Sequence, residues 1–378
     1  MEGYKCVDLF CGAGGFSLGF QRAGFDILAA VDRNESALKT YRHNFEGVHA
    51  VSAEIREFDV EMLSNRSVSG VDDIDVVVGG PPCKGFSTAG RMDPDDPRNE
   101  LVVEYVEAVE QLDPEIVVLE NVTGFLNLED GKYADQLETT LSKKGYIVEE
   151  PDVLTAADYG VPQLRKRVIL VATKGGNFQL PTPSHRPDEP EDWDRYSPEM
   201  EPYVSVEDAI GDLSFLKYGQ EASEYKLKPL TDYQRRMRRG SDEIQNHKAP
   251  NHGETVRERF QQFDYGQKMN ELPEEYQTKK HTMVRWHPRE PAPTVTTLPE
   301  DFVHYERSRI PTVREIARIQ SFPDTFVFKG QRTTGGSQRR HSVPQYTQVG
   351  NAVPPKLAKA VGERVKAHLL NRKVTPGT

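Results

Sequence analysis

Cysteine is scarce in this chain: its 378 residues include only Cys6, Cys11 and Cys83. An odd, small number without paired spacing argues against a disulfide framework and against a zinc site. We therefore expect no bound metal and a reducing, cytoplasmic compartment.

Long apolar runs are also missing, since no stretch approaches the roughly 18 consecutive apolar residues of a membrane span. We expect no membrane association. The N-terminal MEGYKCVDLF has no basic region before an apolar stretch, so we expect no secretory signal. Apolar residues make up 36% of the chain, enough for a packed interior, and the length fits two domains or one domain with an insertion.

Positive charge is in deficit, with a formal net charge of −11. Proteins that bind nucleic acid are usually basic on the binding face, so the net charge alone argues against such a partner. It does not exclude one, because the local field at the binding groove matters more than the total.

The first 174 residues alternate strand-like and helix-like segments. Several strand candidates are short, β-branched and apolar throughout, as expected for strands covered on both faces. The strand candidates are residues 5–10, 27–32, 48–51, 75–79, 116–120, 146–148 and 168–173, and the helix candidates are 34–44, 99–112 and 133–144. This pattern predicts a doubly wound α/β sheet.

The character of the sequence changes after residue 174. Residues 175–310 are rich in proline, charge and polar side chains without regular alternation, which predicts a smaller, irregular domain. Within it, residues 186–224 are acidic, whereas 225–240 carry six Lys or Arg against one Asp. Helical patterns return at 313–320 and 355–370.

A glycine turn follows the first strand candidate, in the segment CGAGGFSLGF with Gly12 and Gly14. Such a turn lets the backbone approach a ligand and directs a helix N-terminus toward it. Ser17 occupies the third glycine position of a nucleotide fingerprint, so a diphosphate fits poorly. Asp32, at the end of the next strand, can accept hydrogen bonds from two ribose hydroxyls. These features favour an adenosine-containing ligand such as S-adenosylmethionine, although a structural turn and a surface aspartate would give the same pattern.

Cys83 lies in GGPPCKGFSTAGR, directly after another strand candidate. The prolines stiffen this loop and the glycines permit unusual dihedrals, so the thiol is presented rather than buried. A nucleophilic cysteine needs an electropositive setting, and Lys84 and Arg91 are near in sequence. Lone cysteines are usually buried in cores, which we expect for Cys6 and Cys11, but the Pro-Pro-Cys setting favours a functional Cys83.

Candidate residues cluster where strands end. Ligands of open parallel sheets bind outside the carboxyl ends of the strands, and Gly12, Asp32, Cys83 and Glu120 each lie at or just after such an end. We expect them to gather on one edge. A carboxylate that ends a buried strand needs a partner, so Glu120 is a candidate acid; an exposed glutamate that caps a helix is the alternative.

Six segments, in order, resemble the motifs of the cytosine-C5 DNA methyltransferases, and the resemblance covers residues 4–174 and 311–365. They are DLFCGAGGFSLGF at 8–20, GGPPCKGFS at 79–87, ENV at 120–122, QLRKR at 163–167, REIARIQSFPD at 314–324 and QVGNAVPP at 348–355. Two positions depart from the family pattern: Lys84 replaces a glutamine, and Glu54 replaces the aspartate directed toward the adenine.

The resemblance implies a Rossmann-like methyltransferase domain formed by residues 1–174 and about 344–378. It implies a target-recognition domain at about 175–343, with its variable part at about 175–310. The cofactor would be S-adenosylmethionine, held by Phe10, Gly12, Gly14, Asp32, Glu54, Ile55, Pro81, Leu101, Asn351 and Val353. Because Asn351 and Val353 follow the insertion, we expect the C-terminal helix to pack on the first domain, beside the cofactor.

The resemblance also implies covalent chemistry on a flipped-out cytosine. The Cys83 thiolate would add to C6 and activate C5, and Glu120 would hydrogen-bond N3 and the exocyclic amine. Arg165 and Arg167 lie two apart on an extended segment and would point the same way, one to the O2 edge of the base and the other to the catalytic loop. Surface charge is the alternative for these arginines.

Double-stranded DNA is the expected partner, which implies a nucleoid-associated protein. We expect a monomer in a restriction-modification system, with no physical need for the endonuclease. Candidate DNA contacts are Lys84, Ser87, Arg235, Arg236, Arg238, Arg239, Arg339 and Arg340, with Arg332 and His341 beside the last pair. A solvated charged helix would explain residues 225–240 equally well. Residues 291–297, PAPTVTT, resemble a loop of the family's recognition domain.

Three other functions are open. A tRNA cytosine-C5 methyltransferase of the same fold would carry a Cys-Phe-Thr signature, but no cysteine follows Cys83. A catalytically inactive DNA-binding relative is disfavoured by the intact Cys83 and Glu120. A nicotinamide oxidoreductase is disfavoured by Ser17 and by the Pro-Pro-Cys loop.

Overall fold

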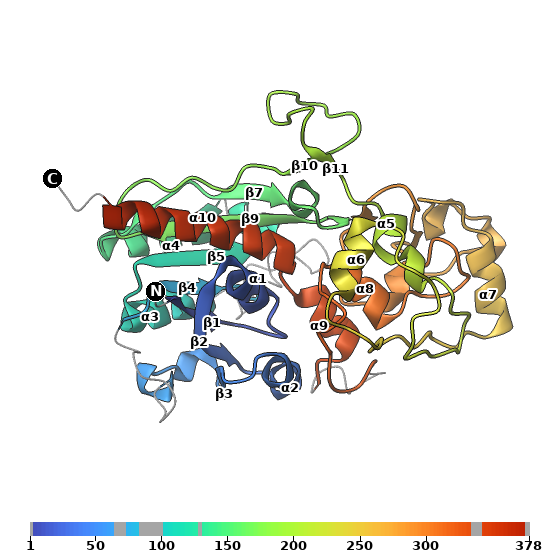
Figure 1. Cartoon of the computed structure of the whole chain (residues 1–378), viewed down its shortest axis with the longest axis horizontal. Helices are drawn as coiled ribbons and strands as arrows, with labels where there is room; N and C mark the ends of the chain where they lie inside the picture. The colour runs from blue at the N-terminus through green and yellow to red at the C-terminus, as the bar shows by residue number, and fades with distance from the viewer. Residues whose placement is uncertain (1–2, 64–72, 83–100, 128–130, 334–341, 375–378) are drawn as a thin grey trace. The chain divides into compact units, whose positions relative to one another are not determined.

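The computed structural model describes residues 3–63, 73–82, 101–127, 131–333 and 342–374 (Figure 1). The chain forms two compact units: residues 1–155, 166–182 and 353–378 make the first, and residues 156–165 and 183–352 make the second. Residues 156–165 and 344–352 therefore belong to the second unit, and 175–182 to the first, unlike the boundaries expected from the sequence. The catalytic and recognition roles assigned to these parts remain predictions.

An eight-stranded sheet forms the centre of the first unit, in the order β3-β2-β1-β4-β5-β9-β6 with β7 beside β9. The strands are β1 Tyr4–Leu9, β2 Phe25–Asp32, β3 His49–Ser52, β4 Val76–Gly79, β5 Ile116–Asn121, β6 Ile147–Val148, β7 Asp152–Thr155 and β9 Lys166–Thr173. Strands β1 to β5 are parallel, whereas β9 runs antiparallel to β5, β6 and β7. The predicted doubly wound α/β sheet is confirmed, with antiparallel pairing at one side.

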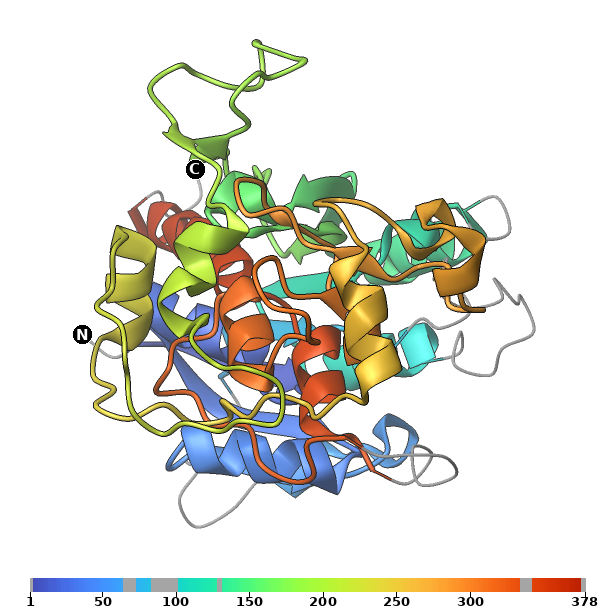
Figure 2. The ribbon, with the colours of Figure 1, turned by 90° about the vertical axis from the view of Figure 1, so that its right-hand side faces the viewer.

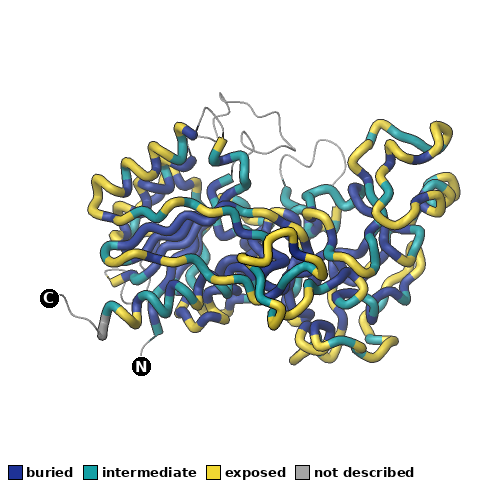
Figure 3. Tube along the Cα trace, turned by 90° about the horizontal axis from the view of Figure 1, so that it is seen from above, coloured by how far each residue is buried: buried dark blue, intermediate teal, exposed yellow. Residues whose placement is uncertain are grey.

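Helices cover both faces of this sheet. They are α1 Gly15–Ala23, α2 Glu35–Asn44, α3 Leu101–Leu112, α4 Lys132–Lys143 and α10 Pro355–Val374. The apolar residues of α3 and α4 form one core with strand residues such as Val77 and Leu119, and Figure 3 shows the strands as a buried band. The predicted helices at 34–44, 133–144 and 355–370 agree with α2, α4 and α10 within a few residues.

The C-terminal helix packs against the first helix of the same unit. A side chain at Gly19 of α1 would collide with Ala358 of α10, and one at Gly362 would lie 3.0 Å from Ala23 Cβ. Glycine at these positions allows the two helices to approach closely. The expectation that the C-terminal helix returns to the first domain is confirmed.

The second unit has little regular structure (Figures 1 and 2). Its helices are α5 Val206–Ile210, α6 Asp232–Arg238, α7 Glu254–Gln261, α8 Val313–Ile319 and α9 Gln345–Asn351. Its strands pair two by two: β8 Gln163–Leu164 with β13 Ala292–Pro293, β10 His185–Arg186 with β11 Glu201–Pro202, and β12 Val284–Arg285 with β14 Phe302–Val303. The prediction of an irregular second domain is confirmed.

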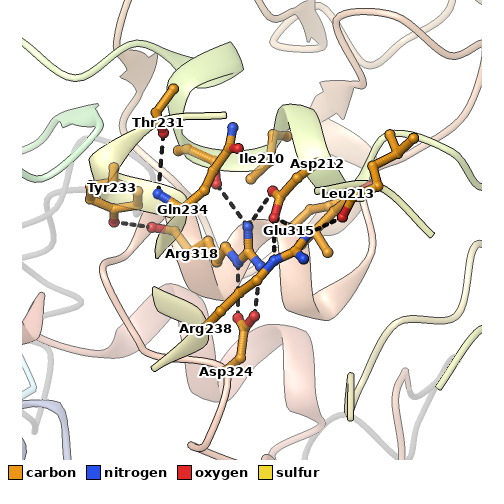
Figure 4. Close-up of polar contacts among 12 residues, drawn as sticks. Ile210, Asp212, Leu213, Thr231, Tyr233, Gln234, Arg238, Glu315, Arg318 and Asp324 are labelled. Atoms are coloured by element: carbon orange, nitrogen blue, oxygen red, sulfur yellow. Dashed lines mark hydrogen bonds and ion pairs between the residues drawn. The ribbon is translucent and has the colours of Figure 1, made fainter. Parts of the chain in front are cut away.

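Buried ion pairs hold this irregular unit together. Arg318 of α8 donates to Asp212 at 2.5 Å and to both oxygens of Asp324 at 2.8 and 2.6 Å, and all three side chains are fully buried (Figure 4). A second pair joins Arg309 to Glu315 through two hydrogen bonds of 2.8 and 2.7 Å. These contacts give the segment 314–324 a structural role in the second unit.

No helix among the residues that the structure describes is long and apolar enough to cross a membrane.

Candidate functional site at the carboxyl ends of the strands

The glycine turn lies between β1 and α1 and has an unusual backbone. Phe10, Gly12 and Gly14 all have positive φ, of 62°, 54° and 97°. A side chain at Gly14 would also collide with the ring of Phe45, so glycine is required there. Phe10 adopts positive φ despite its bulky side chain, and such strained backbone is typical of ligand-binding sites.

Asp32 ties the end of β2 to this turn. Its carboxylate accepts hydrogen bonds from the Gly12 N–H at 2.9 Å and from the Asn34 N–H at 2.7 Å, one on each oxygen. Burial raises the pKa of Asp32 above its ordinary value, although these two donors oppose the shift. Each carboxylate oxygen has two acceptor sites, so both oxygens retain capacity for a ligand hydroxyl.

The other predicted cofactor contacts lie close to the ends of β3 and β4 or at the start of α3. Glu54 is exposed and lies 3.5 Å from the Arg33 guanidinium, while its neighbour Ile55 is buried. Pro81 is buried two residues after β4, and Leu101 begins α3. Ile55 and Leu101 belong to the same apolar cluster, which Phe10 also contacts. The structure thus brings much of the predicted set together within the first unit.

The last two predicted cofactor contacts fall in different units. Val353 is buried and begins the final segment of the first unit, whereas Asn351 is an exposed residue at the end of α9 in the second. That Asn351 and Val353 both contact the cofactor stays a prediction.

Glu120 has the partner that its position requires. Its Oε1 lies 2.7 Å from Nε of Arg167, with side-chain exposures of 12% and 11%. In the antiparallel pair β5 and β9, Glu120 lies opposite Ile169, so Arg167, two residues away, projects on the same face. A Cβ at Gly80 would lie 3.2 Å from Glu120 Oε2, so the start of the Pro-Pro-Cys loop lies against this carboxylate. Burial lowers the pKa of Arg167, and Glu120 opposes that shift.

Arg165 and Arg167 have different hydrogen-bond partners, and the expectation that both point toward the base and the catalytic loop stays a prediction. Its guanidinium donates to the backbone carbonyls of Val295 at 2.9 Å and Gly350 at 3.1 Å. Arg165 lies between β8, which ends at Leu164, and β9, which begins at Lys166. Arg165 thus holds the PAPTVTT segment and the end of α9 within the second unit.

Gln163 extends this arrangement. Its side chain donates to Gln320 Oε1 at 2.7 Å and accepts from the Val295 N–H at 2.7 Å. Two residues of the QLRKR segment, Gln163 and Arg165, thus hold parts of the second unit together. Arg167 of the same segment lies beside Glu120 in the first unit.

The basic stretch 225–240 is less available for DNA than its sequence indicates. Arg238 donates to the buried Asp212 at 2.6 Å and lies over the Tyr225 ring at 3.9 Å, so its guanidinium is engaged within the second unit, and its role as a phosphate contact stays a prediction. Arg235 pairs with Asp232 on the surface, and Arg236 and Arg239 are exposed. Arg332 donates to the Lys248 carbonyl at 3.0 Å.

Several predicted residues lie outside the described part of the chain. They are Cys83, Lys84, Ser87, Arg91, Arg339, Arg340 and His341. Among the described residues, no group of three His, Cys, Asp or Glu side chains could hold a metal ion. Cys6 and Cys11 are buried, as predicted, and burial raises the pKa of both thiols.

Sequence reasoning missed one residue at the glycine turn. Asp8 of β1 is 1% exposed, and its Oδ2 accepts hydrogen bonds from the Ser17 N–H at 3.1 Å and the Ser17 hydroxyl at 2.5 Å. The signal was an acidic residue inside the otherwise apolar strand YKCVDL. A buried carboxylate of this kind needs hydrogen-bond donors, and it finds them in the first turn of α1.

Comparisons with known proteins agree with this geometry. The family model for C-5 cytosine-specific DNA methylase matches residues 4–367. Type II methyltransferase M.DdeI of Desulfomicrobium norvegicum is 37% identical over 97% of this chain and 89% of its own length. Type II methyltransferase M1.HphI of Haemophilus parahaemolyticus is 36% identical over 95% of this chain and 86% of its own.

One solved structure supports the fold. A protein described as a DNA modification methyltransferase encoded within an E. coli prophage superposes with a TM-score of 0.75 at 24% identity. The alignment covers 97% of this chain and 99% of that one.

Proposed function

Because the chain belongs to the C-5 cytosine-specific DNA methylase family, we propose that it methylates C5 of a flipped-out cytosine within a specific DNA sequence, through a covalent Cys83 adduct at C6. S-adenosylmethionine would supply the methyl group. The observation that carries the proposal is the Glu120–Arg167 pair at the end of β5, next to the start of the Pro-Pro-Cys loop.

Each proposed residue has a defined task. The Cys83 thiolate forms a bond to C6, which moves electron density onto C5 so that C5 can take the methyl group. Glu120 hydrogen-bonds N3 and the exocyclic amine, and Arg167, which fixes the Glu120 carboxylate, faces the O2 edge. A base then removes the C5 proton, the C5–C6 double bond re-forms and the thiolate leaves.

The glycine turn fits the proposed cofactor. Among the residues that the structure describes, and apart from its chain neighbours, none has an atom within 4 Å of where a Cβ of Gly12 would lie, so this part of the backbone leaves room for a ligand. Asp32 keeps free acceptor capacity for ribose hydroxyls. Phe10, Gly14, Glu54, Ile55, Pro81, Leu101, Asn351 and Val353 complete the proposed cofactor set.

The second unit would recognise the target sequence. Its segment 291–297 is held by Gln163 and Arg165, which would give a recognition loop a fixed position. The names of the two Type II relatives support a restriction-modification system, and DNA as substrate supports a protein of the cytoplasm and nucleoid.

Incubation with labelled S-adenosylmethionine and mixed DNA, followed by bisulfite mapping, tests the proposal. We expect 5-methylcytosine at one sequence, abolished in Cys83→Ala and retained in the control Cys6→Ala, which removes a buried thiol of β1. If tRNA were labelled and DNA were not, the substrate would have to be reassigned from DNA to RNA. Methyl transfer that survives in Cys83→Ala would overturn the covalent mechanism.

A further inference from the structure

The N-terminus of α1 is occupied by the protein's own carboxylate. Ser17 is the third residue of α1, so its N–H is one of the helix donors without an intrahelical partner. Asp8 accepts this N–H and also the Ser17 hydroxyl, while the same hydroxyl lies 2.8 Å from the Tyr41 hydroxyl. All three side chains are fully buried or nearly so.

This arrangement reverses the usual electrostatics of a glycine turn. The first turn of a helix carries partial positive charge and commonly binds phosphate. Here Asp8 supplies a negative charge at that position, and Asp32 supplies a second one at the turn through its hydrogen bond from the Gly12 N–H. A ligand at this turn lies in the field of two carboxylates, of which Asp8 is buried. The guanidinium groups that act on Asp32 and Cys11 belong to Arg33 and Arg42, and each of them is paired with a glutamate, Glu54 and Glu35.

We propose that Asp8 selects the cofactor by charge: it disfavours phosphate-bearing nucleotides and favours the cationic sulfonium of S-adenosylmethionine over the neutral thioether of S-adenosylhomocysteine. The inference rests on the proposed function, since it concerns the same cofactor site. The absence of the third fingerprint glycine, replaced by Ser17, disfavours a diphosphate by shape alone, whereas Asp8 adds selection by charge. Weaker binding of the neutral thioether would also help the enzyme to release its product.

The charge on Asp8 depends on pH near neutrality. Burial raises its pKa to about 7, the Ser17 hydrogen bonds oppose the shift, and Asp32 adds to it. The other titratable groups that face it are the Tyr41 and Tyr105 hydroxyls and the Cys6 and Cys11 thiols, whose pKa values burial raises above their ordinary values. These four groups stay neutral, so Asp8 and Asp32 provide the negative charge.

Calorimetric binding of S-adenosylmethionine and S-adenosylhomocysteine tests the inference without measuring catalysis. At about pH 8 we expect the wild type to prefer the sulfonium ligand, and Asp8→Asn to reduce that preference about tenfold, or about 1.4 kcal/mol. The preference of the wild type should decline toward that of Asp8→Asn as the pH falls below about 7, whereas the variant should show no such decline. Asp8→Asn should also gain measurable affinity for ADP, used as the phosphate-bearing probe.

Two further variants separate charge from structure. Ser17→Ala keeps the carboxylate but removes one donor to it, so the midpoint of the wild-type pH profile should move upward. Asp26→Asn, at an exposed position of β2, should leave both affinities unchanged. A preference that does not vary with pH in the wild type and persists in Asp8→Asn would overturn the inference. If the wild type bound neither ligand, the proposed function itself would fail instead.

Discussion

Buried carboxylates in the two units have different partners. In the first unit, Asp8 and Asp32 accept hydrogen bonds from backbone N–H groups and a hydroxyl, and burial raises the pKa of both. In the second unit, Glu315 and Asp324 face arginine guanidinium groups. Burial alone would raise their pKa values too, but the arginines outweigh it and lower both.

The partner of a carboxylate distinguishes a candidate ligand site from a group that only stabilises the fold. In the second unit, both oxygens of the fully buried Glu315 and Asp324 accept hydrogen bonds from guanidinium groups, so these carboxylates have little left to offer a ligand, and loss of either leaves a buried cation. Glu120 of the first unit differs, because its contact with Arg167 is on Oε1. A buried carboxylate without a cationic partner keeps an uncompensated charge, which is typical of functional sites. The same residue types therefore stabilise an irregular fold in one unit and prepare a ligand site in the other.

We expect the largest effect on stability from removing the buried ion pairs of the second unit. Arg318→Met removes the fully buried guanidinium that bridges Asp212 and Asp324, so we expect the second unit to lose about 3–5 kcal/mol of unfolding free energy. Urea titration followed by Trp286 fluorescence measures this loss, because Trp286 is fully buried in the second unit. The exposed Trp193, the only other tryptophan, is replaced by Phe in the background.

Arg235→Met is the matched control, since Arg235 pairs with Asp232 on the surface of α6. It should cost less than about 1 kcal/mol. Equal losses in the two variants would contradict the idea that burial makes the ion pairs structural.

The second effect concerns the stability of the first unit. Because the pKa of Asp8 is raised to about 7, Asp8 contributes stability that is fully present below about pH 4 and is lost as the pH rises through 7. Asp8→Asn cannot ionise, so the variant should gain stability relative to wild type by roughly 3–4 kcal/mol between about pH 4 and pH 9. Unfolding in urea followed by circular dichroism measures both proteins, and parallel pH profiles would show that Asp8 does not titrate in this range.

The third effect is on catalysis. Glu120→Gln keeps the shape of the side chain but removes its charge, and we expect kcat to fall about 100-fold with little change in KM for either substrate. The control is Glu107→Gln on the exposed side of α3 in the same unit, which should behave as wild type. Thermal unfolding of both variants shows how much of the loss comes from leaving Arg167 without its partner. An unchanged kcat would remove Glu120 from the mechanism.

The smallest effect concerns DNA binding by α6 and its flank. If Arg236 and Arg239 contact phosphates, changing both to Gln should lower the slope of log Kd against log salt by about 1–2. Arg238→Gln, in contrast, should mainly destabilise the second unit, because Arg238 pairs with Asp212. A salt slope that falls only in Arg238→Gln would reverse these assignments.

Local features of the chain were predictable from the sequence. Apolar β-branched runs, helical periodicity and the Gly12–Gly14 turn depend on neighbouring residues, so most strands and helices of the first unit followed from the pattern. Strand β7, Asp152–Thr155, was not among the predicted strands. The placement of Gly12, Asp32 and Glu120 at carboxyl ends of strands also followed, because parallel topology brings those ends to one edge.

Partners far apart along the chain were decided only by the tertiary structure. The antiparallel insertion of β9 beside β5 places Arg167 next to Glu120, while Arg165 donates to the carbonyls of Val295 and Gly350. Arg238 pairs with the buried Asp212, and Asp8 finds its donors where α1 begins. The sequence by itself determined which segments form and where charges fall along them; packing decided which charges are neutralised, because the cost of burying a charge depends on the partner that the fold brings to it.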